Sequence, residues 1–218
     1  MKYSSSLYQS PLFDGIEQAD VQKLLSCTMA QEKTFPKDSF IVRAGDSVGY
    51  VYLILSGSVH IIDEDFWGNQ SIIETMQAQV FFGEAYVFAK MEHQLISVVA
   101  AEDSVLLVMN PDRLFKVCAC GCAHHEQLKQ NVTNILAIKI VRLTQKLRHL
   151  IRRTIREKLL SYLSQCAQTA GKSAFTIPYT RQQLADYLSV DRSALSHELS
   201  KMRQEGLLRY QKNYFELL

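Results

Sequence analysis

The strongest constraint on the fold is the stretch 122–151, which contains neither proline nor glycine. Without a helix-breaking residue it predicts one continuous helix, roughly 45 Å long at about 1.5 Å per residue. Five apolar residues recur along it at spacings of four, three, four and three: Leu136, Ile140, Leu143, Leu147 and Leu150. This is the heptad pattern of a seam between two helices, with basic residues on its flanks. We therefore predict a dimerisation helix.

A second apolar face on the same stretch leaves another interpretation open. Ile135, Ile138 and Val141 would suit a helix that is buried against its own domain. Both interpretations hold together if one face packs on a neighbouring domain and the other on a second copy of the chain.

Charge is divided unevenly along the chain. Residues 1–141 carry 10 Lys and Arg against 16 Asp and Glu, whereas residues 142–218 carry 14 against 6. A basic C-terminal third on an acidic body favours a polyanion as the partner of that third. Solvated surface charge is the alternative, and charge alone does not decide between them.

Composition excludes several classes of protein. With 218 residues and 47% hydrophobic side chains, the chain can bury a core as one large domain or two small ones. It has no run of eighteen apolar residues and its N-terminus is polar, so we expect no membrane span and no signal peptide. The five cysteines, an odd number, then predict reduced thiols and a cytoplasmic protein.

Short β-branched and aromatic runs predict strands between residues 40 and 109. They lie at 40–42, 50–55, 58–62, 71–75, 95–101 and 105–109, separated by turn residues. Many short strands at regular spacing are typical of an antiparallel roll or barrel. Asn110-Pro111-Asp112 ends this region and predicts a helix at 112–118.

Two helix starts follow each other closely in the basic third. Thr180 reads as an N-cap, with Gln183 three residues later to complete a capping box. Asp191 reads as a second N-cap, after the short turn Leu188-Ser189-Val190. Two short helices joined by such a turn predict a helix-turn-helix motif.

The roll resembles that of a known family. Ala44-Gly45-Asp46, the run 51–59 and Phe82-Gly83-Glu84 resemble the cyclic-nucleotide-binding β-roll of the CRP/FNR family of bacterial transcription regulators. Binding members of that family continue to an Arg-Ser pair that holds the cyclic phosphate, and those places fall on Gln94 and Leu95 here. No arginine occurs between Arg43 and Arg113, so cyclic AMP is not the expected effector. The resemblance places an effector pocket for an unidentified, less charged small molecule at Gly83, Glu84, Ala85, Tyr86, Gln94, Leu95, Ile138 and Val141.

The family likeness is closest in the helix-turn-helix. It covers residues 180–185, 190–196 and 199–202, and residues 206–208 and 214–217 resemble the two strands of the family's wing. Base edges are expected to meet the start of the second helix, and backbone phosphates the start of the first. His197 and Ser193 stand where the family commonly has arginine and often glutamate, which leaves the operator sequence open. The expected DNA-binding residues are Thr180, Arg181, Gln182, Arg192, Ser193, Ser196, His197 and Lys201.

Three further residues have the chemistry of metal ligands. Cys118, Cys122 and His125 are spaced by four and three, so a helix would present them on one side. Some family members carry an iron–sulfur cluster or haem, although cluster-binding relatives hold their cysteines in an N-terminal run that is absent here. Gly121 also interrupts the helical spacing. We expect packing residues and no bound metal, with a metal or redox sensor as the alternative.

Rival functions have less support. A metal enzyme on the roll would need a local histidine cluster, and the roll offers only His60 and His93. A regulatory subunit would have no need for the motif at 180–202. The chain is therefore expected to be a homodimeric, effector-responsive regulator that binds an inverted repeat in double-stranded DNA, contacts RNA polymerase if it activates, and has no enzymatic activity and no membrane partner. Its expected fold is α+β: a jelly-roll-like β-roll (1–121), a dimerisation helix (122–151) and a winged helix-turn-helix (152–218).

Overall fold

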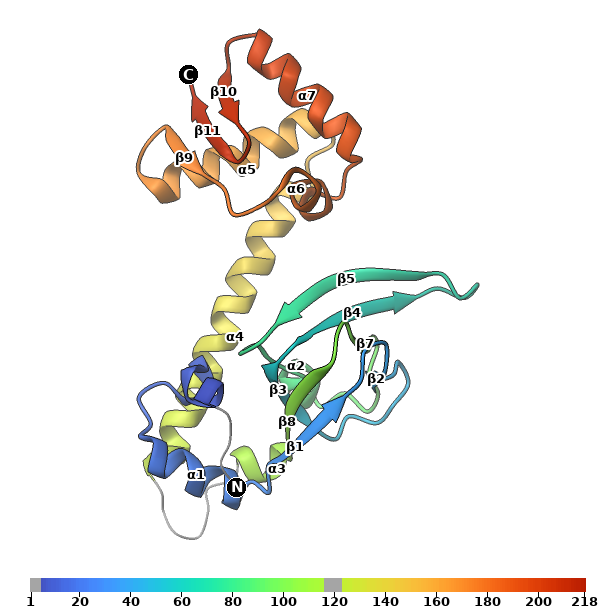
Figure 1. Cartoon of the computed structure of the whole chain (residues 1–218), viewed down its shortest axis with the longest axis vertical. Coiled ribbons are helices and arrows are strands. Elements are labelled where there is room, and N and C mark those ends of the chain that lie inside the picture. Colours follow the sequence, from blue (N-terminus) through green and yellow to red (C-terminus); the bar gives the residue numbers. More distant parts are fainter. Residues whose placement is uncertain (1–4, 116–122) are drawn as a thin grey trace. The chain divides into compact units, whose positions relative to one another are not determined.

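The computed structural model describes residues 5–115 and 123–218 and divides into two compact units, Met1–Ala137 and Ile138–Leu218 (Figure 1). The boundary falls inside the longest helix, α4 (Ala123–Leu150), so each unit contains part of that helix. The continuous helix expected from the sequence is confirmed over this range. The division into 1–121, 122–151 and 152–218 stays a prediction.

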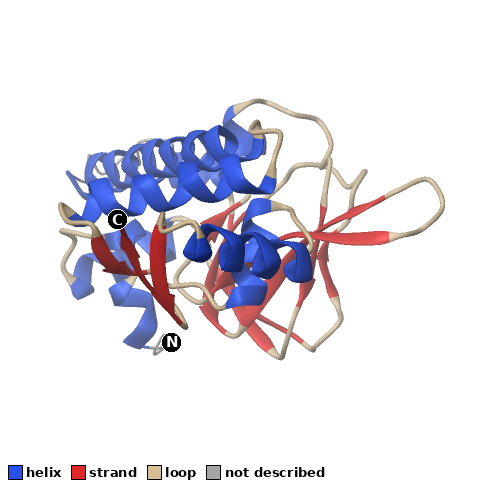
Figure 2. Ribbon diagram, turned by 90° about the horizontal axis from the view of Figure 1, so that it is seen from above, coloured by secondary structure: helices blue, strands red, loops and turns tan. Residues whose placement is uncertain are grey.

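Two four-stranded antiparallel sheets form most of the first unit, as expected for an antiparallel roll (Figure 2). The first sheet runs β1 (Gln31–Phe35), β8 (Ser104–Met109), β3 (Val51–Ser56) and β6 (Phe81–Phe82). The second runs β2 (Phe40–Val42), β7 (Ser97–Ala100), β4 (Ser58–Glu64) and β5 (Gln70–Gln77). The sequence prediction missed β1, which is polar and mostly exposed, and β6, which has two residues.

Short helices complete the first unit. Two 3-10 helices, Ser5–Gln9 and Pro11–Phe13, precede α1 (Gln18–Cys27), and α2 (Glu84–Phe88) follows β6. The helix expected at 112–118 begins one residue earlier, as α3 (Pro111–Phe115), and its last three residues lie outside the described part of the chain. No helix among residues 5–115 and 123–218 is long and apolar enough to cross a membrane.

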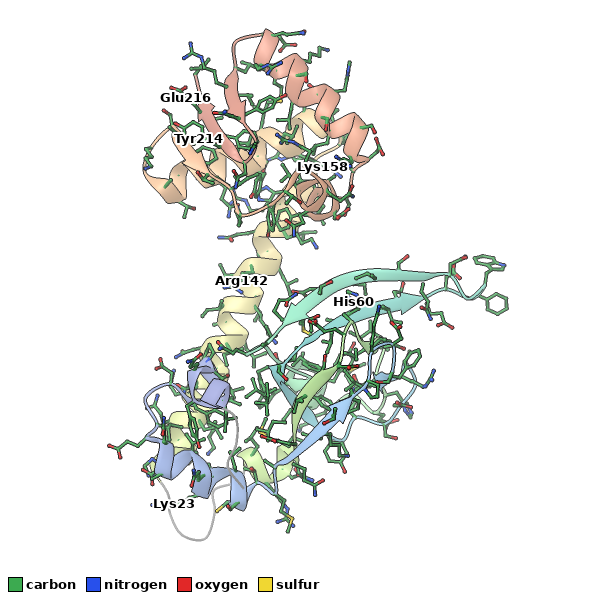
Figure 3. All side chains as sticks on the ribbon, viewed as in Figure 1. Lys23, His60, Arg142, Lys158, Tyr214 and Glu216 are labelled. Carbon is green, nitrogen blue, oxygen red and sulfur yellow. The ribbon has the colours of Figure 1, made fainter. Side chains whose placement is uncertain are left out.

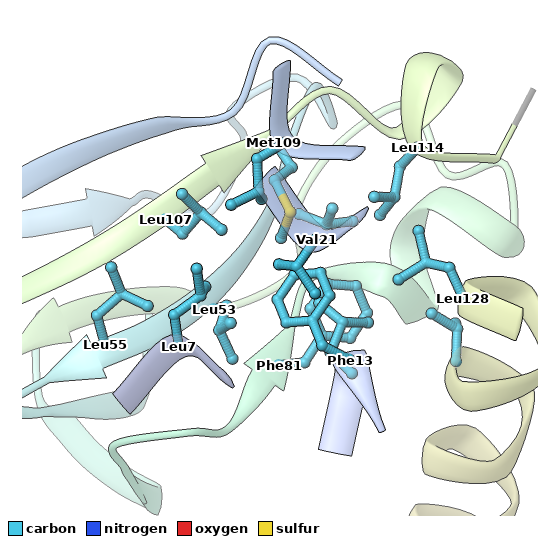
Figure 4. Packing of buried hydrophobic residues seen from close by; sticks show 14 residues of the cluster. Leu7, Phe13, Val21, Leu53, Leu55, Phe81, Leu107, Met109, Leu114 and Leu128 are labelled. Atoms are coloured by element: carbon cyan, nitrogen blue, oxygen red, sulfur yellow. The ribbon is translucent and has the colours of Figure 1, made fainter. Parts of the chain in front are cut away.

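Strand β3 is buried on both of its faces. Val51, Leu53 and Leu55 point into one hydrophobic cluster, whereas Tyr52 and Ile54 point into another. Successive side chains of a strand point to opposite faces, so a strand between two cores reads as an unbroken apolar run. The first cluster also receives side chains from the N-terminal helices, α3 and the start of α4 (Figure 4). The start of α4 is thereby anchored on the roll.

Gly57 makes the tight turn between β3 and β4 possible. Its φ of +81° lies in the left-handed region, and a Cβ atom there would lie 2.7 Å from the backbone oxygen of Asp103. Only glycine avoids both the strain and the clash.

The second unit is the end of α4 followed by a winged helix-turn-helix. Its further elements are α5 (Ile155–Ala170), β9 (Ala174–Thr176), α6 (Arg181–Leu188), α7 (Arg192–Gln204), β10 (Leu208–Gln211) and β11 (Tyr214–Leu217). The three strands form one antiparallel sheet in the order β10-β11-β9. The two wing strands were expected from the sequence, and β9 was not.

The expected seam of α4 is exposed over its middle part. Ile140, Leu143 and Leu147 are 62%, 63% and 58% exposed. Leu136, at the start of the seam, packs against the hydrophobic cluster of the first unit instead. Leu150, at the end of the seam, is half-buried.

Candidate DNA-binding interface and effector region

Both helices of the helix-turn-helix begin at the residues expected from the sequence. The Thr180 hydroxyl accepts a hydrogen bond from the Gln183 amide at 3.3 Å, and the Gln183 side chain accepts one from the Thr180 amide at 2.9 Å. At the start of α7, Asp191 Oδ1 accepts a hydrogen bond from the Ala194 amide at 2.8 Å. These caps satisfy amide groups that have no partner inside the helix, and so they determine where each helix begins.

The turn between α6 and α7 is held from α5. Ser189 closes α6 in the left-handed conformation, with φ of +50° and ψ of +61°. Lys158 Nζ donates hydrogen bonds to the carbonyl oxygens of Leu188 at 3.0 Å and Ser189 at 3.4 Å. An ammonium group at this end also complements the negative pole of the helix dipole. Figure 3 labels Lys158 in this part of the chain.

Helix α7 is fixed on its inner side by packing and by one arginine. Leu195, Leu199 and Met202 are fully buried in the core of the second unit. Arg156 of α5 pairs with Glu198 of α7, with Nε 3.0 Å from the Glu198 carboxylate, and also with Glu205 at the end of α7. Both acidic side chains thus share a single guanidinium from α5. The outer side of α7 keeps its basic character.

Most of the expected base-reading side chains lie on that outer side. Arg192, Ser193, His197 and Lys201 are exposed. Ser196 is half-buried, and its backbone oxygen accepts a hydrogen bond from the Ser200 hydroxyl at 3.1 Å. Guanidinium, ammonium, imidazole and hydroxyl groups at the N-terminal half of a helix are suited to hydrogen bonds with base edges and phosphates.

Arg181 was expected to contact a backbone phosphate, and in the structure its guanidinium packs on the wing. Its guanidinium lies over the rings of Tyr210 and Phe215, with the Cζ atom 5.1 and 5.4 Å from their centroids, and donates a hydrogen bond to the Lys212 carbonyl at 3.0 Å. Burial lowers its pKa from the ordinary value. Arg181 therefore connects the start of α6 to the wing.

The two neighbours of Arg181 are exposed. The Thr180 hydroxyl serves the helix cap, and Gln182 Nε2 donates to Asp186 Oδ1 at 2.8 Å along α6. The expected DNA-binding residues therefore come together in the second unit, on and around α6 and α7.

The expected effector region lies around the start of α2. Gly83 caps this helix with a φ of +88°, and a Cβ atom there would lie 3.1 Å from the Tyr50 carbonyl oxygen. Glu84 is buried and Ala85 is exposed. The rings of Tyr52 and Phe82 stack beside the turn with centroids 5.0 Å apart. Gly83 is thus required by the close approach of the β3 backbone.

Gln94 and Leu95 are the residues expected at the places of the family's phosphate-binding pair. The backbone of Gln94 accepts a hydrogen bond from the Gly45 amide at 2.8 Å and donates one to the Asp46 carbonyl at 2.9 Å. Its side chain is buried, whereas Leu95 is 65% exposed. Burial raises the pKa of Tyr86, and a hydrogen bond from the Leu95 backbone acts in the opposite direction. Tyr86 is therefore hydrogen-bonded to the backbone of Leu95.

The remaining predicted site residues are two on α4 and the three candidate metal ligands. Ile138 and Val141 belong to the second unit and are 52% and 55% exposed. Cys118 and Cys122 lie outside the described residues. His125 is 2% exposed, and neither of its ring nitrogens has a hydrogen-bond partner among residues 5–115 and 123–218. Within the same residues no group of three His, Cys, Asp or Glu side chains could hold a metal ion.

Sequence reasoning missed three residues of other helices that contact the helix-turn-helix. Arg156 and Lys158 of α5 and His149 of α4 act through contacts with α6 and α7, and each is far from those helices in sequence. In the sequence these three residues are visible only as basic residues of a basic segment. Such residues are equally expected on a solvated surface.

Comparisons with known proteins match both units. The sequence model of the family described as "Cyclic nucleotide-binding domain" matches residues 32–119, and that of the "Crp-like helix-turn-helix domain" matches residues 157–218. The anaerobic regulatory protein of Bacillus subtilis is 24% identical over 196 residues, which cover 87% of this chain and 80% of the relative. The cAMP-activated global transcriptional regulator CRP of Pasteurella multocida is 20% identical over 185 residues, covering 80% and 83%.

Solved structures share the fold. The c-di-GMP responsive global regulator CLP of Xanthomonas campestris aligns over 92% of this chain and 99% of its own, with a TM-score of 0.60 and 18% identity. The roll, the long helix and the winged helix-turn-helix occur here in the order of these proteins, and both matched domain types are those of one family. This chain therefore belongs to the CRP/FNR family of DNA-binding transcription regulators and is not an enzyme.

Proposed function

We propose that this protein is a homodimeric regulator that binds an inverted-repeat operator through α7. The observation that carries the proposal is the outer face of α7, where Arg192, Ser193 and His197 are exposed while Glu198 is paired with Arg156. Such a face offers hydrogen-bond donors to base edges. The first helix, α6, would contact backbone phosphates beside it.

Dimerisation is supported by the exposed apolar residues of α4. Ile140, Leu143 and Leu147 are each more than half exposed, and they recur at the heptad spacing of a two-helix seam. Two copies joined by this seam would present their α7 helices to successive major grooves, about 34 Å apart, so the operator would be an inverted repeat with that spacing. The protein would act in the cytoplasm and would contact RNA polymerase if it activates transcription.

The effector is proposed to be a small molecule other than cyclic AMP. Relatives differ in this respect, since CRP is named as cAMP-activated and CLP as c-di-GMP responsive. Here the phosphate-binding pair is replaced by a buried amide and an exposed leucine, at Gln94 and Leu95. Neither residue supplies the positive charge that a cyclic phosphate requires.

The experiment is a DNA-binding titration of the full chain. An operator is first selected from random double-stranded DNA, and wild type and variants are then titrated against the operator and a scrambled sequence. Arg192→Ala should weaken operator binding by roughly 1–3 kcal/mol and leave scrambled binding nearly unchanged. Arg113→Ala, which makes the same change on α3, is the matched control. Equal loss on both DNAs for Arg192→Ala would contradict the assignment of α7 as the base-reading helix.

A second candidate function, metal sensing, is favoured by the buried and unpartnered ring nitrogens of His125 among the described residues. Burial lowers the pKa of His125, so its ring is neutral and able to coordinate a metal at neutral pH. Cys118 and Cys122 would be its co-ligands. Protein purified under reducing conditions should then contain stoichiometric zinc or iron that Cys122→Ser releases. Metal-free protein that binds its operator normally would exclude this function.

A further inference from the structure

Helix α4 ends in an aromatic cluster that belongs to the same compact unit as α6 and α7. His149, one residue before the helix end, is only 1% exposed. Its ring lies edge-on to Tyr162 of α5, with centroids 5.7 Å apart, and tilted against Tyr187 of α6 at 6.3 Å. One side chain of α4 thus contacts both α5 and the first helix of the helix-turn-helix.

Three tyrosines near His149 also contact one another. Tyr179 and Tyr187 stack with centroids 5.0 Å apart, and Tyr162 lies 5.5 Å from Tyr187 and 6.2 Å from Tyr179. Lys146, one turn before His149, places its Nζ atom 5.7 Å from the Tyr187 ring. Aromatic contacts of this kind stabilise a fold by more than the area they bury. We call the contact of His149 with these tyrosines the joint between α4 and the helices α5 and α6.

Both ring nitrogens of His149 lie near polar side chains of α5. Its Nδ1 atom lies 2.8 Å from the Ser161 hydroxyl oxygen. Its Nε2 atom and Gln165 Oε1 are both buried, and a side-chain hydrogen bond with Gln165 acts to raise the pKa of His149. An amide oxygen can only accept a hydrogen bond. A neutral ring that carries its proton on Nε2 can donate that bond to Gln165. The Ser161 hydroxyl then donates to Nδ1.

A protonated ring would be poorly accommodated at this place. Burial lowers the pKa of His149, Gln165 acts in the opposite direction, and Arg148 and Arg152 lower it further. Tyr162 on α5 and Tyr187 on α6 contact the ring directly. Behind them, Cys166 is hydrogen-bonded to Tyr162, and Lys146 of α4 lies over the ring of Tyr187. Burial raises the pKa of Tyr162, Cys166 and Tyr187, so these groups supply no negative charge at neutral pH. Protonation would add a cation to a buried site on which Arg148 and Arg152 already act.

We propose that the neutral imidazole of His149 is a positioning residue, which fixes α5 and α6, and through them α7, against the last turn of α4. This inference rests on the proposed function in one respect, the dimer seam on α4. If α4 forms that seam, the angle between α4 and the helices α5 and α6 sets the separation of the two α7 helices. DNA affinity then falls on acidification, because protonation weakens the joint.

The pH range follows from the direction of the shift. The folded pKa lies below the ordinary value of 6.5, so the folded protein binds fewer protons than the unfolded chain. The stabilising effect is complete above pH 6.5 and is lost as the pH falls from there toward the folded pKa.

The test combines ring NMR of the free protein with DNA binding at pH 8 and pH 5.5. Wild-type full chain should show a buried histidine that carries its proton on Nε2 and titrates below pH 6.5. Ser161→Ala should move this titration upward, because the hydroxyl no longer donates to the neutral ring. A His149 resonance that titrates as an exposed histidine would overturn the proposal.

In the DNA arm, His149→Phe keeps an aromatic ring that cannot be protonated. Between pH 8 and 5.5 the wild type should lose roughly two- to tenfold more affinity for the selected operator than this variant does, the size of one buried hydrogen bond. His197 and the phosphate contacts are common to both proteins, so the comparison removes their contribution. His93→Phe, in the first unit, is the matched control and should behave as wild type.

Equal pH dependence of wild type and His149→Phe would overturn the positioning role. Failure of wild type to bind any selected DNA at pH 8 would instead overturn the proposed function, and the NMR titration would still decide the state of His149.

Discussion

The Nζ atom of Lys158 on α5 lies 3.0 Å from the carbonyl oxygen of Leu188, the last residue of α6. The carbonyls at a helix end have no partner inside the helix, and here a side chain from 30 residues earlier supplies one. The same ammonium reaches Ser189, whose left-handed backbone turns the chain toward α7. The geometry of the helix-turn-helix is therefore maintained from outside the motif.

Lys158→Met should destabilise the second unit. The variant keeps most of the apolar stem and removes the charged hydrogen bonds to Leu188 and Ser189, which should cost roughly 1–2 kcal/mol in the free energy of unfolding. Chemical denaturation followed by tyrosine fluorescence measures this loss. Lys172→Met, at an exposed lysine after α5, is the matched control. Equal stability of the two variants would show that the cap contributes nothing.

Arg181→Ala should weaken binding to operator and scrambled DNA alike. The guanidinium lies over Tyr210 and Phe215 and bonds the Lys212 carbonyl, so its removal loosens the wing as well as any phosphate contact nearby. Neither effect carries sequence information. The measurement is the binding titration at two salt concentrations, with Arg209→Ala of the wing as control. A change of sequence preference in Arg181→Ala would contradict this assignment.

Leu143→Glu should separate the proposed dimer. The substitution places one carboxylate from each chain in an apolar seam, where neither finds a partner. Sedimentation equilibrium should show a monomer at concentrations where wild type is a dimer. Thr144→Glu adds the same charge at the next position, outside the heptad pattern, and should leave the dimer intact. A tight dimer for Leu143→Glu would place the seam elsewhere.

Cyclic AMP should not bind at micromolar concentration. Because Gln94 and Leu95 replace the arginine and serine that hold the cyclic phosphate in the family, calorimetric titration should give no saturable heat. A double variant carrying Gln94→Arg and Leu95→Ser is the matched comparison and should bind more tightly than wild type. Micromolar binding by wild type would refute this interpretation of the effector region.

Much of the fold could be predicted because its signals are local. The unbroken apolar run of β3, the absence of breakers in α4 and the N-caps Thr180 and Asp191 each act within a few residues. The strands that were missed lack such a signal: β1 is polar, and β9 has three residues and exists only because it pairs with β11. Their pairing partners are distant in sequence, so period and propensity do not reveal them.

The contrast between local signals and distant contacts also applies to the candidate DNA-binding residues. The spacing of Leu195 and Leu199 sufficed to predict which side of α7 faces outward, because a capped helix with these residues buried has only one outward face. That Arg192 and His197 on this face read bases stays a prediction. That Arg181 would lie on the wing was not predictable, since Tyr210 and Phe215 reach it only after the wing has folded back.

The sequence by itself thus determined the order of roll, long helix and winged helix-turn-helix, and the family to which the chain belongs. Those properties depend on local periodicity, caps and breakers, which the chain carries wherever it lies in space. Tertiary structure alone decided which basic residues are structural: Arg156 pairs with Glu198, Lys158 caps α6, and His149 is buried among tyrosines. The reason is that charge and hydrogen-bond partners are set by distance in space, and each of these side chains meets partners from other helices.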